Sequence, residues 1–441
     1  SARTAAVSWR PSVAAVRFLQ EILAFPIIAG RIPIYGLPGP RTFDFMELSS
    51  VHRGYKRPPM AQMPWYGLRG VFGMLLFVLC QGCMQSAAPG EAQNPGVLES
   101  DGVSWATGFG FKDEGQVLWV TDGAGSDTVH WVKEGRGQWP TGEGYVLPAS
   151  TLRLATWSTT HVPFVLALGV DQQWVASGYL DRVRPMADTT RGSCLNLGGD
   201  AGISEETLLA SQADVLTSYP FGDPMEGVES RTGVPVLAMA EYVEAHPLGR
   251  AEYVKLFGWL LDQSERADSV FQAIEGRYLK QVKLAQEASK KTGRPTVFTG
   301  SFSGGQWTAP TERGLVARMI QDAGGHYVFN AQTAADYGLR QVGNNYEVEP
   351  EQCALIAEGC EAWGRVVYAP SGWSMTDVQA EAPWCNFSGK TVFHCNTAEV
   401  DYFGAAILEP DRMLEDLLSV LHPDLAIPSA SPYFQRTGTT E

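Results

Sequence analysis

The chain has 441 residues, of which 44% are hydrophobic and 18% are charged, and its formal net charge is −15. This composition is typical of a folded globular protein and excludes a largely disordered chain. The first 70 residues carry nine Lys or Arg against three Asp or Glu, whereas the rest carry 24 against 45, a net charge of −21. Such an acidic body repels nucleic acid phosphates and anionic lipid, so we expect neither as a partner.

An uncharged segment with an apolar run from Val71 to Leu79 lies well inside the chain, preceded by Arg69 and followed by small residues. The run is too short to cross a bilayer, which takes about 20 residues, and its flanks are typical of a secretory signal peptide. Gly82 and Cys83 resemble the end of a bacterial lipoprotein cleavage box, in which the Cys receives lipid. We therefore predict a signal peptide over residues 60–82, lipidation at Cys83 and a flexible tether over 83–100. Residues 1–59 are then expected to be a non-native or disordered extension.

Strand-like runs follow the tether. Three of them, residues 116–122, 128–134 and 144–149, are separated by Gly, Asp and Ser, and the first two predict a hairpin. Later runs show little alternation, as expected of parallel strands buried on both faces; they are residues 152–158, 214–219, 235–240, 296–301, 365–370 and 391–396. Helical patterns lie between several of them, such as 204–213 and 311–325, so parallel sheets covered by helices are predicted.

The longest helical pattern lies in the middle of the chain, after a shorter one at residues 248–263. Apolar residues recur at intervals of three and four, Ser264 offers an N-cap, and Gly293 ends the pattern. A helix of about 28 residues is roughly 42 Å long, which is the length of a strut between two lobes. We predict an α/β fold with an N-terminal lobe at 101–247, a helical linker at 248–292, a C-terminal lobe at 293–430 and a tail at 431–441.

Two lobes joined by one rigid helix leave a ligand cleft, and ligands of open parallel sheets bind beyond the carboxyl ends of the strands. Nearly every predicted strand end carries an aromatic residue beside a Gly or a hydroxyl. This suits a large, partly planar ligand held by stacking and a few hydrogen bonds, although core packing is the alternative for any single aromatic residue. The candidate ligand-binding residues are Ser158, Thr159, Thr160, His161, Tyr219, Phe221, Phe302, Trp307, Trp373 and Tyr402.

Signatures of common enzyme classes are missing from the sequence. Phe302 stands where a nucleophile elbow needs Ser, Asp113 stands where a dinucleotide fingerprint needs its third Gly, and no Walker lysine motif occurs. We predict no catalytic residue, no cofactor and no local metal motif. Export would permit disulfides, so Cys353 with Cys360 and Cys385 with Cys395 are candidate pairs, and buried free thiols are the alternative.

Four segments, residues 158–169, 241–278, 295–328 and 401–425, resemble in the same order the substrate-binding proteins of ABC importers for iron complexes and vitamin B12. The resemblance runs from about residue 103 to 425. It implies two Rossmann-like lobes with parallel central sheets, bridged by one long backbone helix, with the ligand cleft between them. It further implies a monomeric, lipid-anchored receptor of the periplasm or cell envelope, not an enzyme, that delivers an iron–siderophore or cobalamin-type ligand to a membrane permease.

The resemblance also implies roles for single residues. Family members pair one surface carboxylate of each lobe with arginines of the permease; Glu226 matches the first, and Asp377 or Glu381 the second. His161 either contacts the ligand or caps the helix that follows it. Where relatives often have Trp-Glu, this chain has Phe403 and Gly404.

Two other functions remain open from the sequence. One is a receptor for free zinc or manganese that uses His161, His326 or His394 with carboxylates. The other is an envelope metal-dependent hydrolase that uses the same cleft.

Overall fold

The computed structural model describes residues 101–121, 128–136, 144–184, 193–220, 225–303, 306–427 and 433–438. Cys83, Phe221, the predicted signal peptide and the predicted tether lie outside these ranges. Within the ranges, no helix combines the length and the apolar character needed to cross a bilayer.

The N-terminal lobe begins with a mixed sheet in the order β1-β2-β3-β4. Its strands are β1 (Phe109–Lys112), β2 (Val117–Thr121), β3 (Thr128–Lys133) and β4 (Gly144–Leu147). The antiparallel pairing of β2 with β3 confirms the predicted hairpin, and β4 runs parallel to β3. The sequence did not mark β1 as a strand.

The second sheet of this lobe has the order β10-β9-β5-β6-β7-β8 and is parallel except for β8. Leu154 of β5 packs in one core with Phe164 and Phe257, whereas Ala155 packs with Leu208 on the other face, which confirms burial on both faces. The runs predicted at residues 152–158, 214–219 and 235–240 contain β5, β9 and β10. The elements are β5 (Leu154–Thr156), η1 (Thr159–His161), α2 (Val162–Leu168), η2 (Asp171–Gln173), β6 (Trp174–Gly178), η3 (Leu180–Arg182), β7 (Leu195–Gly199), β8 (Gly202–Ile203), α4 (Glu205–Ser211), β9 (Val215–Ser218), α5 (Val228–Thr232), β10 (Val236–Ala238) and η4 (Glu241–Val243).

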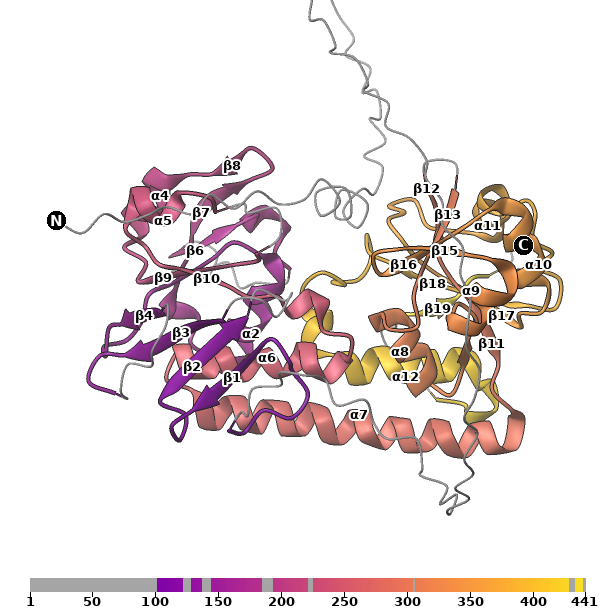
Figure 1. The fold of residues 1–441 in the computed structure, drawn as a ribbon, viewed down its shortest axis with the longest axis horizontal. Helices are drawn as coiled ribbons and strands as arrows, with labels where there is room; N and C mark the ends of the chain where they lie inside the picture. Colours follow the sequence, from indigo (N-terminus) through magenta and orange to yellow (C-terminus); the bar gives the residue numbers. More distant parts are fainter. Residues whose placement is uncertain are drawn as a thin grey trace, which may run out of the picture. The chain divides into compact units, whose positions relative to one another are not determined.

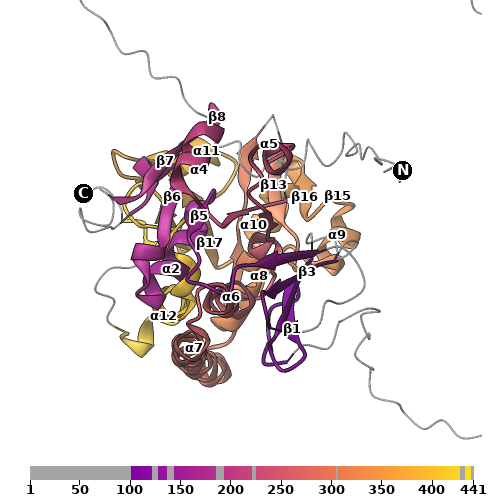
Figure 2. The same cartoon turned by 90° about the vertical axis from the view of Figure 1, so that its left-hand side faces the viewer.

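Two helices, α6 (Pro247–Leu260) and α7 (Ser264–Thr292), connect the lobes. Helix α7 is one unbroken helix of 29 residues (Figure 1), about 44 Å long at 1.5 Å per residue. It packs against α6 of the linker, against α2 of the N-terminal lobe and against α8 and α12 of the C-terminal lobe, and Figure 2 shows α6 beside it. The predicted strut is therefore confirmed. The N-cap prediction was wrong by one residue: Gln263 occupies that position, without a side-chain cap, because the chain turns at Asp262 with a positive φ of 55°.

The C-terminal lobe contains a sheet in the order β14-β11-β17-β18-β19 and an antiparallel sheet in the order β12-β13-β16-β15. The first is parallel except for β19, which pairs antiparallel with β18, so part of the predicted tail belongs to the sheet. The elements are β11 (Thr296–Phe298), β12 (Ser301–Ser303), β13 (Gln306–Pro310), α8 (Leu315–Asp322), β14 (His326–Tyr327), α9 (Ala331–Tyr337), β15 (Arg340–Val342), β16 (Asn345–Val348), α10 (Pro350–Glu358), β17 (Ala362–Val367), α11 (Met375–Glu381), β18 (Thr391–Asn396), η5 (Ala405–Leu408), α12 (Pro410–Leu421), η6 (Pro423–Leu425) and β19 (Gln435–Arg436).

The cysteines of the described ranges are buried and free, including both candidate pairs. The structure thus agrees with the alternative of buried thiols. Burial raises the pKa of Cys360 and of Cys395 to about 12, so both sulfurs stay protonated at neutral pH.

Candidate ligand-binding site

The loops at the carboxyl ends of the two parallel sheets contact each other. Thr159 follows β5, and its hydroxyl donates a hydrogen bond of 3.1 Å to the carbonyl oxygen of Phe403. Arg184, beyond the end of β6, donates a bond of 3.2 Å to the carbonyl oxygen of Ala398. Both acceptors follow β18. These loops therefore form the candidate site, because ligands of open parallel sheets bind beyond the carboxyl ends of the strands.

On the N-terminal lobe, three neighbouring strands each end at an aromatic residue. Tyr219 follows β9, Trp157 follows β5 and Tyr179 follows β6, in the order of the strands in the sheet. Neighbouring strands lie about 4.8 Å apart, and the ring centroids of Trp157 and Tyr179 are 5.3 Å apart. Trp157 is buried, whereas the two tyrosines are half-buried. Trp157 thus supports a row of rings at this edge.

The backbone holds Tyr179 in an unusual conformation. Its φ of 50° lies in the left-handed region, which costs about 1–2 kcal/mol for a residue with a Cβ. A Cβ on Gly178 would lie 2.5 Å from the Trp157 ring, and one on Gly199 would lie 3.3 Å from the Tyr179 ring. Two glycines therefore leave room for these rings. The guanidinium of Arg182 lies 4.8 Å from the centre of the Tyr179 ring and pairs with Asp200 at 2.5 Å.

His161 lies in a buried polar network below this edge. Its Nδ1 is 3.0 Å from the Thr217 hydroxyl, and its Nε2 is 3.6 Å from Glu241 Oε2. The Thr160 hydroxyl donates to Glu241 Oε1 over 2.7 Å. Burial acts to raise the pKa of Glu241, but His161 and Thr160 outweigh it and hold that pKa below its usual value. The network fixes the loop after β5, whose first turn is capped by Ser158 Oγ.

Neither of the two predicted roles of His161 appears in this arrangement. The residue precedes α2, but its side chain makes no cap hydrogen bond to the helix, so the capping alternative is wrong. Its side chain is 0% exposed and has no surface with which to contact a ligand. The structure favours a positioning role.

On the C-terminal lobe, aromatic side chains at strand ends remain exposed. Phe302, in the strand that follows β11, is 47% exposed, Tyr368 directly after β17 is 65% exposed, and Phe403 in the loop after β18 is 51% exposed. The strands β11, β17 and β18 are neighbours in the sheet. Phe302 itself belongs to β12 of the antiparallel sheet, whereas Tyr368 and Phe403 follow two neighbouring strands of the parallel sheet. Of the three, Phe403 is the residue whose carbonyl oxygen accepts the bond from Thr159.

Other predicted residues lie deeper. Trp307 is 0% exposed, packs against Phe298 at 5.4 Å and donates its Nε1–H to the Thr299 carbonyl over 3.0 Å, which favours core packing. Trp373 stacks on Trp363 at 5.7 Å. Burial raises the pKa of Tyr402 to about 12, and its ring lies 5.2 Å from that of Phe403. Tyr402 is therefore placed to support the exposed ring of Phe403, whereas Trp373 packs on the buried Trp363.

Sequence reasoning missed Tyr179 and Tyr368, and it treated Phe403 only as a departure from relatives. Tyr368 lies within the predicted run 365–370 and directly follows β17. Its position at the end of an apolar run could therefore have marked it as a candidate. The Phe403–Gly404 departure has a local cause, because a Cβ on Gly404 would lie 2.4 Å from the Asp401 carboxylate, which accepts the Ala405 N–H at 2.8 Å.

The candidate docking carboxylates differ in what surrounds them. Glu226 is exposed and lines a groove of about 550 Å³ with Tyr145 and Glu229. Asp377 is exposed in the first turn of α11, where bonds from Ser374 hold its pKa below the usual value. Glu381 is 18% exposed and pairs with Arg365 at 2.6 Å. Because Arg365 already compensates Glu381, Asp377 is the better candidate on this lobe.

The histidines of the metal-receptor hypothesis lie apart. His326 on β14 and His394 on β18 are separated by β11 and β17 in one sheet, a lateral distance of about 14 Å. His161 follows β5 in the N-terminal lobe. His394 Nδ1 lies 2.8 Å from the Thr437 hydroxyl. In the part of the chain that the structure describes, no group of three or more His, Cys, Asp or Glu is placed to hold a metal ion.

Comparisons with known proteins bear on this arrangement. An uncharacterized lipoprotein of Methanocaldococcus jannaschii is 26% identical over 238 residues, which are 53% of this chain and 54% of that protein. The chain thus spans about half the length of the curated relative it matches. A periplasmic heme binding protein of Pseudomonas aeruginosa is 16% identical with a TM-score of 0.49 and covers 66% of this chain and 99% of its own. The heme-binding protein RhuT of Roseiflexus is 16% identical with a TM-score of 0.45 and covers 62% and 99%.

A family model with the description "Periplasmic binding protein" matches residues 154–343. The match begins at β5, includes the whole of α7 and ends beyond β15, so it contains strands of both lobes and the helix that bridges them. Residues 154–343 are thus similar to the periplasmic binding protein family, which confirms the resemblance found in the sequence motifs.

Proposed function

We propose that this protein is the substrate-binding lipoprotein of an ABC importer, which captures an iron–siderophore or cobalamin-type ligand and delivers it to a membrane permease. One observation carries the proposal: the carboxyl edges of two parallel sheets contact each other through Thr159 and Phe403, within a match to the periplasmic binding protein family. The rings at these edges suit a large ligand that is bound by contact and released unchanged.

The proposal treats the protein as a receptor and not as an enzyme. His161 and Glu241, which lie below the edge of the N-terminal lobe, are both buried. A base or acid in catalysis must come within hydrogen-bond reach of the substrate. These two side chains instead hold the loop that carries Thr159.

The bridging helix suggests how the receptor moves. Hinge motions take place at a few loop or element-terminal residues, and α7 passes between the lobes without a break. We expect ligand binding to change the distance between the lobes only slightly. A permease would then recognise the ligand-bound protein by surface charge as well as by its shape.

Anchoring and location are part of the proposal. The lipoprotein name of the Methanocaldococcus relative, together with the signal-like segment before Cys83, supports export to the cell envelope with lipid on Cys83. Mass spectrometry of the exported protein should find the lipid on this Cys. The variant Cys83→Ser should be recovered in the soluble envelope fraction and not in membranes.

A ligand panel tests the function. The purified protein is titrated with cobalamin, haem, ferric catecholate and ferric hydroxamate complexes, and tryptophan fluorescence is followed. Saturable binding of at least one of them at a 1:1 ratio is expected. If none binds, the ligand class is wrong. Stoichiometric zinc or manganese in protein purified without chelator would favour the free-metal receptor instead.

A further inference from the structure

We propose that the exposed side of the second half of α7 rests on anionic lipid headgroups of the membrane that holds the anchor. Four lysines form this surface, here called the lysine face: Lys280, Lys283, Lys290 and Lys291. The inference goes beyond the proposed function and rests on it only for the lipid anchor at Cys83.

The exposed lysines of the described residues are confined to this face. The chain beyond residue 100 has eight lysines, and the four outside the lysine face are buried or half-buried; they are Lys112, Lys133, Lys255 and Lys390. The stretch from Arg277 to Arg294 carries six Lys or Arg against one Glu, although the residues after 70 have a net charge of −21. A local concentration of charge opposite in sign to the rest of the protein indicates an electrostatic interaction surface.

The lysine face lies on the side of α7 that points away from the core. At 3.6 residues per turn its four members fall within about 100° of one another, opposite the buried Tyr278 and Ala285. In the described part of the chain none of the four forms an ion pair, whereas the neighbouring Arg277 pairs with Asp411 at 2.5 Å. Their charges are therefore available to a partner.

The helix dipole accounts for only part of this pattern. Cations in the last turn of a helix stabilise it, and Lys290 and Lys291 lie in the last turn of α7. That effect falls off within one turn, whereas Lys280 and Lys283 precede the last residue, Thr292, by 12 and 9 residues. The dipole therefore leaves Lys280 and Lys283 unexplained.

The residue type favours lipid over a protein as the partner. Lys is depleted in protein–protein interfaces, where Arg is enriched. A lysine ammonium is a hydrated point charge on a flexible stem, which suits mobile phosphate headgroups, and clusters of about four or more cations near a membrane attract anionic lipid. The net charge led us to expect no lipid partner, but charges beyond about 10 Å are screened at 0.1 M salt, so the nearby lysine face decides the interaction.

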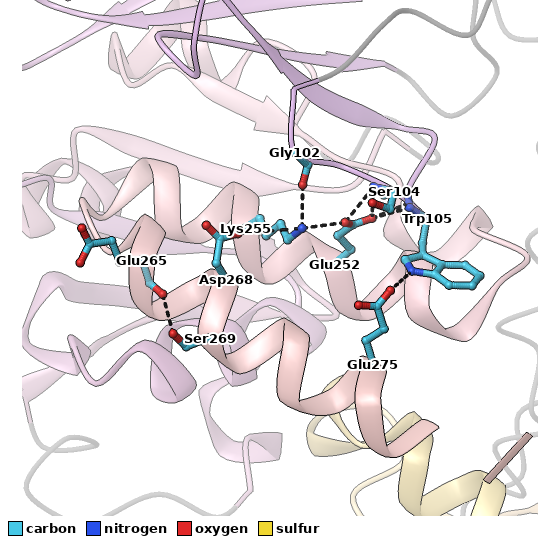
Figure 3. A network of polar contacts seen from close by, with 10 residues as sticks. Gly102, Ser104, Trp105, Glu252, Lys255, Glu265, Asp268, Ser269 and Glu275 are labelled. Atoms are coloured by element: carbon cyan, nitrogen blue, oxygen red, sulfur yellow. Dashed lines mark hydrogen bonds and ion pairs between the residues drawn. The ribbon is translucent and has the colours of Figure 1, made fainter. Parts of the chain in front are cut away.

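The chain that comes from the anchor reaches α7 beside the lysine face. The Trp105 indole donates a hydrogen bond of 2.6 Å to Glu275 of α7 (Figure 3). Glu275 precedes Lys280 by five residues, which is about 8 Å along the helix. The 17 residues 84–100 separate Cys83 from the described chain, and such a segment spans at most about 60 Å. The anchor therefore keeps the lysine face within reach of the membrane.

Contact through the lysine face leaves the candidate docking surfaces free. Figures 1 and 2 both show α5 and α11 on the side of the molecule away from α7. Glu226 lies just before α5, and Asp377 lies within α11. The receptor thus rests on lipid through one side and meets a permease through another.

The experiment uses the exported protein in vesicles of phosphatidylcholine alone and of phosphatidylcholine mixed with phosphatidylglycerol. Lysines are acetylated with a water-soluble reagent, and mass spectrometry gives the rate at each of them. Wild type is compared with Lys280→Gln/Lys283→Gln and with a control of equal charge change, Arg136→Gln/Arg340→Gln, at two exposed positions. Equal rates at Lys290 and Lys291 in phosphatidylcholine confirm that α7 is intact in all three proteins.

In wild type, phosphatidylglycerol should slow acetylation of Lys290 and Lys291 at least about fivefold, while the rates at Lys112 and Lys390 stay unchanged. Each lysine near an anionic surface favours contact about fivefold, so the variant without Lys280 and Lys283 should show less than about twofold protection. The arginine control should be protected as wild type is. Salt at 1 M, where the Debye length is about 3 Å, should abolish protection.

The outcomes separate this inference from the proposed function. Equal rates in the two kinds of vesicle overturn the inference. Protection that rises with protein density in phosphatidylcholine overturns it too, because a second copy of the chain would then cover the lysine face, and so does protection by inorganic phosphate alone. Protein that carries no lipid refutes the anchor. Its sedimentation with vesicles that contain phosphatidylglycerol, and not with phosphatidylcholine alone, would still support the lysine face, and lack of that sedimentation would overturn it.

Discussion

At the scale of single residues, His246 shows how burial makes a histidine sensitive to acid. Its Nδ1 accepts the Leu248 N–H at 3.1 Å and caps α6. Its ring lies 4.3 Å from that of Trp105, and its Nε2 is 3.9 Å from Asp322. Burial and the nearby Arg318 lower the pKa of His246 to about 4, although Asp322 acts in the opposite direction.

The stability of the protein should therefore fall in mild acid. Unfolded, His246 titrates near pH 6.5, so between about pH 6.5 and pH 4 the unfolded state binds a proton that the folded state does not. Each pH unit then costs up to about 1.4 kcal/mol from this residue. His246→Asn keeps an acceptor for the cap and removes the titration, so its unfolding temperature should fall less steeply over this range. Parallel curves for variant and wild type would contradict this assignment.

At the scale of elements, buried carboxylates join the first described segment to the helical linker. Glu252 of α6 is fully buried and accepts the backbone N–H groups of Ser104, Trp105 and Ala106 at 2.7–2.9 Å. Lys255 pairs with Glu252 at 2.9 Å, and the Trp105 indole donates to Glu275 of α7 at 2.6 Å (Figure 3). Glu244 accepts the next two N–H groups, those of Thr107 and Gly108.

These contacts predict that replacing Glu by Gln destabilises the protein much more at position 252 than at position 275. Glu252→Gln turns an amide NH₂ towards backbone donors and leaves Lys255 without its buried partner, which should cost about 3–5 kcal/mol. Glu275→Gln keeps an oxygen for the single bond from Trp105 and should cost less than about 1 kcal/mol. Urea unfolding measures both losses, and hydrogen exchange at residues 104–106 should accelerate only in the first variant. Equal losses would show that the carboxylate charge of Glu252 is not needed.

Two glycines of the helical linker should respond to alanine in opposite directions. Gly276 is exposed in the middle of α7, and a Cβ there meets no atom within 4 Å. Gly276→Ala should therefore raise stability by about 0.5–1 kcal/mol. A Cβ on Gly258 of α6 would lie 2.4 Å from the Cβ of Ala267, so Gly258→Ala should cost about 1–3 kcal/mol. The urea midpoints should move apart, and a shift of both in one direction would contradict the close α6–α7 packing.

The sequence predicted those elements whose own residues determine them. Helix α7 and strands β5, β9 and β11 carry strong apolar patterns, so periodicity was sufficient to identify them. Strand β7, with the sequence Leu-Asn-Leu-Gly-Gly, and the two-residue strand β19 carry little strand preference of their own. Their hydrogen-bonded neighbours β6 and β18 determine them, and sequence patterns do not contain that information.

At the scale of the whole molecule, the candidate site depends on which strands are neighbours. Tyr219 and Phe302 were predicted because each follows an apolar run. The importance of Tyr179 appears only when β6 is known to lie beside β5, and the burial of Trp307 appears only when Thr299 is known to accept its indole N–H. Sequence patterns therefore identified the strand ends at which a ligand site was expected. Only the three-dimensional packing distinguished aromatic side chains at the surface of the site from those buried in the core.

Surface charge on the two lobes is expected to govern docking to a permease. Glu226 and Asp377 are exposed carboxylates on the two lobes, and charge complementarity mainly affects association and register. Glu226→Gln with Asp377→Asn should reduce stimulation of the cognate importer's ATPase while leaving ligand affinity and unfolding temperature nearly unchanged. Asn at 377 retains an acceptor for the Ser374 N–H, so α11 should remain capped.

The control is an equal change of charge elsewhere on the surface, Glu206→Gln with Glu351→Gln, both of which are exposed. The control should stimulate the importer as wild type does. Raised salt should weaken stimulation by wild type and have less effect on the docking variant, because ions screen exposed charges over about 10 Å at 0.1 M. Glu381→Gln is tested separately, since it also removes the partner of Arg365. If the docking variant and its control stimulate the importer equally at every salt concentration, Glu226 and Asp377 are ordinary surface carboxylates, and the ligand site is unaffected by that result.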